Sequence, residues 1–365
     1  MTVTAGPHAA TSARRAAFHT LVIASVEFLC DDAVAVTFDV PERLAEAYAF
    51  LPGQSLTLRR TVGGREERRS YSICAAAGAR PRIGVREVPG GAFSTWLVHD
   101  ARPGDEVEVQ TPTGTFTADP AGGGRHLLIA AGSGITPVLS IVSSLLAGGD
   151  AQVTLVYANR RTDTVMFAEE LADLKDTYGP RFDVMHVLSR EPREVELFSG
   201  RLDGARLRAL LTALVPVHLV DHFWLCGPLG LVTEARALLD ELGVLPAQVH
   251  RELFYVDAPP PDPVRHDDRG VVGPSSQVTI TMDGRSTELR LPRSSPVLDS
   301  AQQARSDLPF ACKGGVCGTC RAQVTEGEVD MRRNYALEPE EVAAGFVLTC
   351  QSYPVSDEIT VDYDS

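Results

Sequence analysis

The sequence has little positive charge and almost no lysine. Its 34 basic residues include two lysines, Lys175 and Lys313, and they face 48 acidic residues, which leaves a net charge of −14. A protein this acidic is poorly suited to bind nucleic acid or an anionic membrane surface, so we expect neither partner. Because lysine is so scarce, a contact to a phosphate group would have to come from arginine.

The chain also lacks an apolar signal segment and the cysteine pattern of a disulfide framework. Residues 1–17 contain no apolar run and predict a disordered start. Seven cysteines, an odd number, favour a reducing compartment, so we expect a cytoplasmic protein. The uncharged stretch 127–149 contains Gly132-Ser-Gly-Ile-Thr-Pro137. It therefore predicts a buried strand, a turn and a helix instead of a membrane span.

Four cysteines near the end of the chain carry the strongest signal. They are spaced C-x4-C-x2-C with one distant partner, as in plant-type [2Fe–2S] sites, at Cys312, Cys317, Cys320 and Cys350. The intervening glycines permit the positive φ angles that a loop around an anionic cluster needs. A structural zinc site is the alternative, although zinc usually takes two short Cys pairs. Four structural thiols are a further alternative.

The arrangement of apolar runs predicts three domains. Short alternating runs predict a small antiparallel β-barrel in residues 18–118. Compact apolar runs with helical stretches between them predict a parallel α/β sheet in residues 119–256. Residues 257–275 contain five prolines and predict a semi-rigid linker. Residues 276–365 then predict a small α+β domain that holds the four cysteines.

Two short motifs lie in the barrel segment. They are Arg69-Ser-Tyr-Ser72, which is expected between strands, and Gly90-Gly-Ala-Phe-Ser94, which is expected before a helix over 95–100. Their residues and order resemble those of the ferredoxin–NADP reductase superfamily. The resemblance implies that FAD binds here. It implies that Arg69 holds the pyrophosphate, Tyr71 packs on the isoalloxazine and the Ser72 hydroxyl reaches flavin N5. It also implies that Gly91 and Ser94 place a helix N-terminus against the pyrophosphate.

The second segment resembles the nicotinamide domain of the same superfamily. Ala130-Ala-Gly-Ser-Gly-Ile-Thr-Pro137 follows a strand and precedes a helix, as a phosphate turn does. Thr136 is expected at the N-cap and Pro137 at the first helical position. The turn has the G-x-G-x-x-P form of the superfamily, so the resemblance implies that Gly132, Ser133, Gly134, Thr136 and Pro137 bind the nucleotide.

Two later stretches extend this resemblance. Cys226-Gly227-Pro228 ends a strand, and the resemblance places Cys226 beside the nicotinamide, where hydride passes to flavin N5 near Ser72. Taken alone, Cys226 would be read as a small buried residue at a strand end. Glu252 matches a position close to the flavin, although an ordinary terminal strand has the same appearance.

The residues at two strand ends favour NADPH over NADH. NAD sites often carry an acid about 20 residues after the phosphate turn, whereas NADP sites supply arginine. Here Arg160 follows one strand, and Ser189 and Arg190, which match the superfamily's 2′-phosphate site, follow the next. Asp163 and Glu191 lie nearby and leave NADH open.

The domain order, flavin then nicotinamide then cluster, resembles the reductase components of multicomponent oxygenases. Motifs such as Leu197-Phe-Ser-Gly-Arg-Leu202 and Val347-Leu-Thr-Cys-Gln-Ser352 are most similar to the reductase subunits of bacterial phenylacetyl-CoA epoxidases. That resemblance implies electron transfer from NADPH through FAD and the cluster to a di-iron oxygenase that epoxidises phenylacetyl-CoA. A flavin is needed because NADPH gives two electrons as hydride while the cluster takes one.

Two alternatives stay open at this point. One is a reductase of the same architecture that serves another oxygenase, such as a steroid hydroxylase, and uses NADH. The other is a redox-responsive regulatory protein that carries the cofactors without steady turnover.

Overall fold

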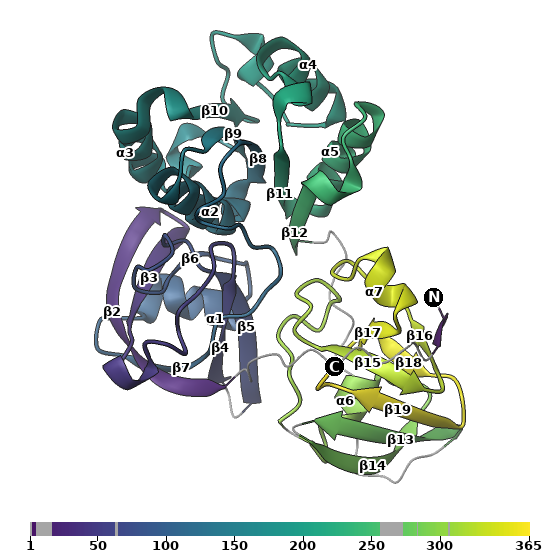
Figure 1. Ribbon diagram of the computed structural model, residues 1–365. Coiled ribbons are helices and arrows are strands. Elements are labelled where there is room, and N and C mark those ends of the chain that lie inside the picture. The colour runs from purple at the N-terminus through teal and green to yellow at the C-terminus, as the bar shows by residue number, and fades with distance from the viewer. Residues whose placement is uncertain (1, 5–16, 63–64, 256–272, 283, 306) are drawn as a thin grey trace. The chain divides into compact units, whose positions relative to one another are not determined.

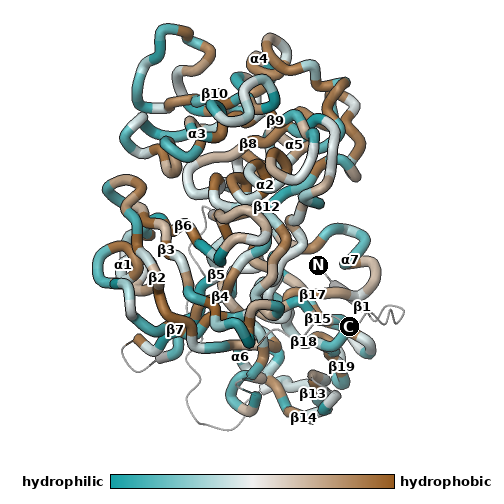
Figure 2. Tube along the Cα trace, turned by 60° about the vertical axis from the view of Figure 1, so that its left-hand side comes forward, coloured by the Kyte–Doolittle hydropathy of each residue, from teal (hydrophilic) through white to brown (hydrophobic). Residues whose placement is uncertain are grey.

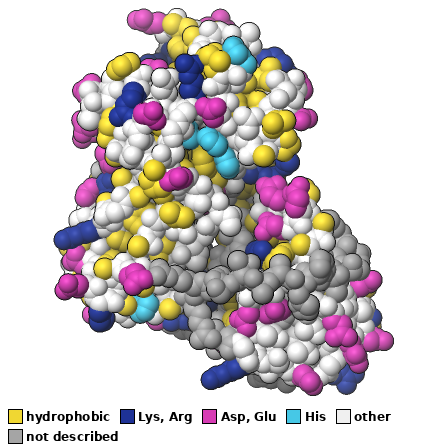
Figure 3. All heavy atoms as spheres, in the orientation of Figure 1, with side chains coloured by type: hydrophobic (Ala, Val, Ile, Leu, Met, Phe, Trp, Pro, Cys, Tyr) yellow, Lys and Arg dark blue, Asp and Glu magenta, His cyan; other side chains and the backbone are white. Residues whose placement is uncertain are grey.

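The computed structural model describes residues 2–4, 17–62, 65–255, 273–282, 284–305 and 307–365. The chain divides into two units, Ala16–Asp257 and Met1–Arg15 together with Ala258–Ser365. Figure 1 shows both units. The described residues form no helix long and apolar enough to span a membrane. Acidic side chains are spread over the face of both units that Figure 3 presents.

The first unit begins with an antiparallel sheet in the strand order β5-β4-β7-β2-β3-β6. An antiparallel bridge between Ile73 and Ile83 joins the end of β5 to β6, so that the sheet closes on itself as a barrel. Its interior holds fully buried apolar side chains, as the alternating runs predict. The strands are β2 (Phe18–Cys30), β3 (Ala33–Asp39), β4 (Ser55–Val62), β5 (Arg65–Ser72), β6 (Arg82–Arg86) and β7 (Glu106–Gln110).

Two local predictions in the barrel were wrong. Arg69-Ser-Tyr-Ser72 does not lie between strands but forms the end of β5, paired with Ser55–Leu58 of β4. The helix expected over 95–100 begins earlier, as α1 (Ala92–Thr95), and continues as one π turn over Trp96–Asp100. Gly91 is its N-cap, and a Cβ there would lie 3.0 Å from the Val88 carbonyl oxygen, so glycine permits this tight entry.

The same unit continues as a parallel sheet in the order β10-β9-β8-β11-β12. Because β9 and β10 extend to one side of β8 while β11 and β12 extend to the other, the strand order reverses between β8 and β11. Ligands of such sheets bind at the carboxyl ends of the strands at this reversal. The strands are β8 (Arg125–Ala131), β9 (Gln152–Asn159), β10 (Phe182–Leu188), β11 (His222–Pro228) and β12 (Val249–Tyr255).

Helices cover the two faces of this parallel sheet, with α2 and α3 on one side and α4 and α5 on the other (Figure 1). The helix α2 is hydrophobic over most of its length (Figure 2) and buries eleven residues, which explains the long uncharged stretch in the sequence. The prediction of a strand, a turn and a helix over 127–149 is confirmed. The helices are α2 (Ile135–Gly148), α3 (Ala168–Tyr178), α4 (Gly204–Leu214) and α5 (Leu229–Glu241).

The start of α2 differs from its prediction. The helix begins at Ile135 with Gly134 as N-cap, so Thr136 and Pro137 are its second and third residues. The Thr136 hydroxyl donates to the Ser133 carbonyl at 3.0 Å and does not cap the helix. Pro137 is tolerated there because the N–H groups of the first turn have no partner inside the helix.

The second unit is an α+β domain with a five-stranded and a three-stranded sheet, in the orders β14-β13-β19-β15-β17 and β1-β16-β18. Its elements are β1 (Thr2–Thr4), β13 (Ser275–Met282), β14 (Arg285–Pro292), α6 (Val297–Ala301), β15 (Arg321–Glu326), β16 (Glu328–Met331), α7 (Pro339–Ala343), β17 (Phe346–Leu348), β18 (Ser352–Pro354) and β19 (Glu358–Asp362). The expected linker falls mostly on residues outside the described ones, since 256–272 are not described.

Residues 1–17 were expected to be disordered, but three of them form a strand. Thr2–Thr4 form β1 and pair antiparallel with Glu328–Asp330 of β16. An edge strand with free N–H and C=O groups accepts such an added strand, and threonine and valine favour extended backbone. Residues 5–16 lie outside the described residues.

Candidate functional site

Three of the predicted residues meet where β5 of the barrel approaches the carboxyl ends of β11 and β12. The Ser72 hydroxyl donates to Glu252 Oε2 at 3.2 Å, although the two residues are 180 positions apart. Cys226 is paired in register with Glu252 and, on its other side, with Ala130. The structure therefore gathers Ser72, Cys226 and Glu252 at the strand-order reversal.

Burial controls the protonation of two of these side chains. It raises the pKa of Glu252 to about 8, against which the hydrogen bond from Ser72 acts. Burial and the neighbouring Glu252 raise the pKa of the Cys226 thiol. At neutral pH both groups are therefore neutral. Glu252 can donate or accept a proton, whereas the Cys226 thiol remains a small uncharged neighbour.

Tyr71 and Arg69 precede Ser72 along β5. The centroid of the Tyr71 ring lies 6.2 Å from that of the Phe93 ring in α1, and burial raises the pKa of the Tyr71 hydroxyl. The Arg69 side chain is 48% exposed and forms an ion pair with Glu67 at 2.9 Å, so it is available at the surface. Ser94 is buried, and its hydroxyl accepts from the Val88 N–H at 3.0 Å and donates to the Gly91 carbonyl. Ser94 thus shapes the turn before α1.

The phosphate turn packs directly against the end of β11. A Cβ on Gly134 would lie 2.4 Å from the Cys226 carbonyl oxygen, which no side chain tolerates. Gly132 has φ +55 and its carbonyl accepts from the Tyr157 hydroxyl at 3.0 Å. Gly227 completes this close approach, since its Cβ would lie 3.2 Å from that of Ala131. The glycines of Gly132-Ser133-Gly134 and Cys226-Gly227-Pro228 therefore bring the two strand ends together.

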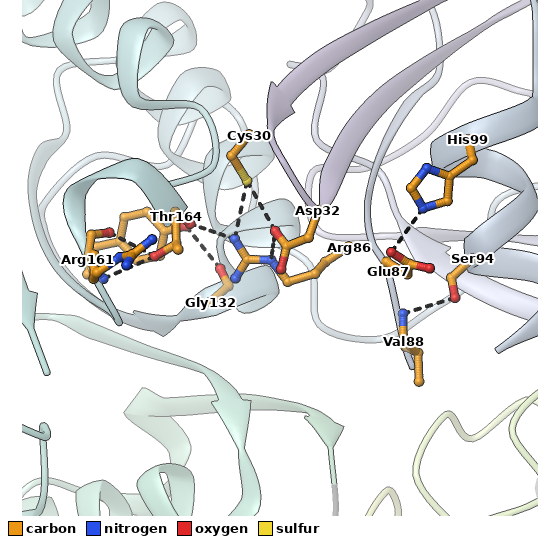
Figure 4. A network of polar contacts seen from close by, with 11 residues as sticks. Cys30, Asp32, Arg86, Glu87, Val88, Ser94, His99, Gly132, Arg161 and Thr164 are labelled. Atoms are coloured by element: carbon orange, nitrogen blue, oxygen red, sulfur yellow. Dashed lines mark hydrogen bonds and ion pairs between the residues drawn. The ribbon is translucent and has the colours of Figure 1, made fainter. Parts of the chain in front are cut away.

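Arg86 is a residue of this site that the sequence did not reveal. It comes from β6 of the barrel, and its guanidinium donates to the Thr164 carbonyl at 2.5 Å and to Asp32 Oδ1 at 3.1 Å. Figure 4 shows it reaching toward Gly132, whose Cβ position is 3.4 Å from Arg86 Nη1. This places a cation from the barrel beside the phosphate turn. Its only sequence signal was an arginine at the end of a strand.

The residues proposed to select the nucleotide lie together at the ends of β9 and β10. The Arg190 N–H donates to the Arg160 carbonyl at 2.8 Å, and the Ser189 N–H donates to the Asn159 carbonyl at 2.9 Å. All three side chains, those of Arg160, Ser189 and Arg190, are exposed. Within the described part of the chain, neither guanidinium has an ion-pair or hydrogen-bond partner.

Asp163 and Glu191, the two nearby acids that leave NADH open as the nucleotide, already have polar partners. Asp163 pairs with Arg161 at 2.6 Å. Glu191 accepts from both the N–H and the hydroxyl of Thr162 at 2.7 Å, and these bonds lower its pKa. Asp163 is therefore paired with Arg161 and Glu191 is bonded to Thr162, so neither acid pairs with Arg160 or Arg190.

In the second unit, the four cysteines form two pairs. The Cys312 and Cys317 thiols are neighbours, as are those of Cys320 and Cys350. No group of three or more His, Cys, Asp or Glu side chains among the described residues converges on one metal position. Two thiol pairs suit a cluster with two irons, each taking two thiolates, better than a single zinc with four.

The backbone around the first pair offers hydrogen bonds to sulfur. Gly314 and Cys317 N–H donate to Cys312 Sγ at 3.3 and 3.4 Å. The contact with Cys317 and these N–H groups lower the pKa of Cys312 to about 5. The loop is therefore suited to hold a thiolate, the form that ligates iron.

Comparisons with known proteins identify the domains that carry these residues. The oxidoreductase FAD-binding domain matches residues 20–118, the oxidoreductase NAD-binding domain 128–237, and the 2Fe-2S iron-sulfur cluster binding domain 280–355. The chain is 41% identical over 353 residues to one of the subunits of 1,2-phenylacetyl-CoA epoxidase from Escherichia coli (strain K12), across 95% of this chain and 98% of that protein.

The chain belongs to the ferredoxin–NADP reductase superfamily. It is one of the members with a C-terminal [2Fe–2S] domain, and it is an iron–sulfur flavin oxidoreductase that uses FAD, a [2Fe–2S] cluster and a pyridine nucleotide. The zinc alternative is set aside by the same match.

Other relatives of this reductase are also oxygenase components. It is 33% identical to the ferredoxin reductase component of 3-ketosteroid-9-alpha-monooxygenase from Rhodococcus rhodochrous, over 94% of this chain and 96% of that protein. The crystal structure of phthalate dioxygenase reductase shares its fold, with a TM-score of 0.59 over 94% of this chain and 98% of that one at 24% identity. The chain is thus the reductase component of an oxygenase system.

Proposed function

We propose that this reductase passes electrons from NADPH through FAD and the [2Fe–2S] cluster to a di-iron oxygenase that epoxidises phenylacetyl-CoA. The observation that supports the partner is the 41% identity to a phenylacetyl-CoA epoxidase protein, which extends over nearly the whole of both chains. We further propose the domain limits 18–118, 119–256 and 276–365, with 257–275 as linker.

In this proposal, bound FAD converts the two-electron hydride of NADPH into the single electrons that a [2Fe–2S] cluster accepts. Tyr71 packs against the flavin, Arg69 exchanges Glu67 for the pyrophosphate, and Ser72 holds its hydroxyl at the reacting edge. Glu252 is neutral because its pKa is raised. It accepts the hydrogen bond from Ser72 and places no negative charge beside the reacting edge of the flavin. The small uncharged Cys226 leaves room for the nicotinamide.

The nucleotide is held by the turn and by the exposed arginines. Gly132, Ser133, Gly134, Thr136 and Pro137 belong to the phosphate turn and the first turn of α2, whose free backbone N–H groups face the pyrophosphate. Ser189, Arg190 and Arg160 bind the 2′-phosphate, because two cations without partners at the strand ends favour a dianion over a hydroxyl. This supports NADPH. Cys312, Cys317, Cys320 and Cys350 ligate the cluster.

A reductase for another oxygenase is the second candidate, because the 3-ketosteroid-9-alpha-monooxygenase component is 33% identical over a similar span. The test is NADPH oxidation by the purified protein mixed with the phenylacetyl-CoA oxygenase components, with and without phenylacetyl-CoA. Consumption that requires both and yields epoxide supports the first candidate. Rapid oxidation with an artificial acceptor but no coupling would reject the partner and retain the reductase chemistry, while no rapid turnover would favour the regulatory protein.

A further inference from the structure

The backbone at Lys313, between the first two cysteines, has an unusual conformation. Among the described residues, the non-glycine residues with positive φ are Phe167 and Lys313, and Lys313 has φ +50. A residue with a Cβ avoids this region unless its surroundings fix it there. Such an exception directly beside a proposed cluster ligand indicates that the orientation of this peptide matters.

The side chain of Lys313 is anchored away from the cysteines. Its ammonium donates to Asp299 Oδ1 and to Gln302 Oε1, both at 2.8 Å, and lies 4.6 Å from the centre of the Phe310 ring. These contacts fix the side chain of Lys313 against α6 and the residues that follow it. They do not determine which way the following peptide group faces.

That peptide group, between Lys313 and Gly314, is hydrogen-bonded on both of its edges. Its N–H, from Gly314, donates to Cys312 Sγ at 3.3 Å. Its C=O, from Lys313, accepts from the Gln351 side-chain amide at 2.8 Å. Because a trans peptide is planar with its N–H and C=O on opposite sides, a donor that fixes the carbonyl also directs the N–H toward the sulfur.

Gln351 is itself held in one position. It is 5% exposed, its Nε2 also donates to the Cys350 carbonyl at 3.0 Å, and its own backbone carbonyl accepts from Arg332 N–H at 3.0 Å. Its Cγ lies 3.2 Å from where a Cβ on Gly315 would be, so the cluster loop passes directly over this side chain. Gln351 therefore acts as a fixed donor that follows the fourth cysteine and reaches the peptide group after the first.

We propose that Gln351 is a positioning residue that sets the reduction potential of the cluster through the Lys313–Gly314 peptide. The proposal rests on the assignment of Cys312, Cys317, Cys320 and Cys350 as the ligands. An N–H donated to a ligand sulfur stabilises the more negative, reduced cluster and raises its potential. Without Gln351 the peptide is free to turn, its N–H leaves Cys312 Sγ, and the potential falls.

The test uses the full-length holoprotein with Gln351→Leu, which removes the amide donor and keeps the apolar stem. Its matched control is Gln323→Leu. Gln323 is a fully buried glutamine of β15 in the same unit, and its amide donates to the Ala344 carbonyl. Both variants lose a buried hydrogen bond, so a general loss of stability affects both.

We expect Gln351→Leu to lower the equilibrium constant for cluster reduction about tenfold relative to Gln323→Leu, because outer-shell hydrogen-bond partners tune a metal site through its ligands. For one electron this is about 59 mV in an EPR-monitored redox titration. The D₂O-induced shift of the Fe–S stretching frequencies in resonance Raman spectra should also be smaller in Gln351→Leu than in Gln323→Leu. Equal potentials in the two variants would overturn the proposal and leave Gln351 a structural residue.

A measurement on the unaltered protein covers the case in which Gln351→Leu fails to assemble a cluster. ENDOR of the reduced wild-type protein should show an exchangeable proton coupled to the cluster that is replaced slowly in D₂O, because the Gly314 N–H is held in place by the Gln351 contact. Complete exchange within the mixing time would contradict the proposal. A wrong ligand assignment is distinguished from a wrong proposal by Cys350→Ala, which would then leave the cluster spectrum unchanged.

Discussion

The flavin–nicotinamide site takes its residues from two domains, whereas the candidate cluster ligands all come from residues 312–350. In the first site, the key contact joins Ser72 and Glu252, which are 180 positions apart. In the second, short loop hydrogen bonds such as Gly314 N–H to Cys312 Sγ set the geometry. The first site therefore depends on the packing of two domains against each other and the second on the fold of one domain, so the two should fail independently.

The sharpest way to separate the two sites is Cys350→Ala. Removing one of four proposed thiolates should abolish the [2Fe–2S] spectrum and electron delivery to a one-electron protein acceptor. Reduction of the flavin by NADPH should continue at the wild-type rate, because no residue of that site is altered. Stopped-flow flavin bleaching measures this. A cluster that survives the change would contradict the ligand assignment.

The converse change is Gly134→Ala at the phosphate turn. The added Cβ would meet the Cys226 carbonyl oxygen at 2.4 Å, so we expect a loss of about 1–3 kcal/mol in the free energy of unfolding of the flavin–nicotinamide unit. NADPH-driven flavin reduction should fall while the cluster spectrum stays unchanged. The matched control is Gly230→Ala in α5, where nothing lies within 4 Å of the new Cβ. Equal stability in the two variants, from thermal unfolding, would show that the turn is not constrained by this contact.

A smaller effect tests nucleotide choice within the first site. Arg190→Ala removes a charge-assisted contact to a 2′-phosphate worth about 1.5–3 kcal/mol, so the KM for NADPH should rise roughly tenfold or more while that for NADH changes little. Arg161→Ala is the control, because the Arg161 guanidinium already pairs with Asp163. If both variants shifted the two nucleotides alike, the selectivity would have to lie elsewhere.

The smallest expected effect is a pH dependence confined to the parallel sheet. His250 stacks on Trp224 at 4.0 Å and lies beside His222, and burial, with His222 and His126, lowers its pKa from 6.5 to about 4. Between these two pKa values the unfolded chain binds a proton at His250 that the folded chain does not bind. The contribution of His250 to the free energy of unfolding should therefore be complete above pH 6.5 and fall as the pH drops toward 4. His250→Phe should flatten this slope in thermal unfolding of the flavin–nicotinamide unit. A slope unchanged by the substitution would assign it to other groups.

The sequence predicted most of what depends on local pattern. The antiparallel barrel and the parallel sheet followed from apolar periodicity within residues 18–118 and 119–256. The cysteine spacing predicted the cluster domain, which the family match confirms. Where the start of a helix depends on tertiary contacts, as at Thr136 and Pro137, the local capping rule was wrong, because the turn packs on Cys226.

The sequence did not predict the residues whose roles depend on partners that are distant in sequence. Arg86 is unremarkable at the end of a strand until the fold brings it to Thr164 and Gly132. Gln351 carries no motif of its own, and only the folded loop shows its amide at the Lys313 carbonyl. Periodicity and spacing give information about residues that are close in sequence, whereas Arg86 and Gln351 contact residues that are distant in sequence.

The scarcity of lysine gives the molecule a built-in pair of chemical markers. Lys175 lies in α3 of the nicotinamide domain and Lys313 in the cluster loop, so each unit carries one side-chain amine. A bifunctional amine-reactive reagent can therefore join the two units through side chains at a single pair of positions. The shortest reagent that cross-links Lys175 to Lys313 can be determined separately for the oxidised and the reduced protein. Its length would report how closely the cluster loop approaches the nicotinamide domain in each state.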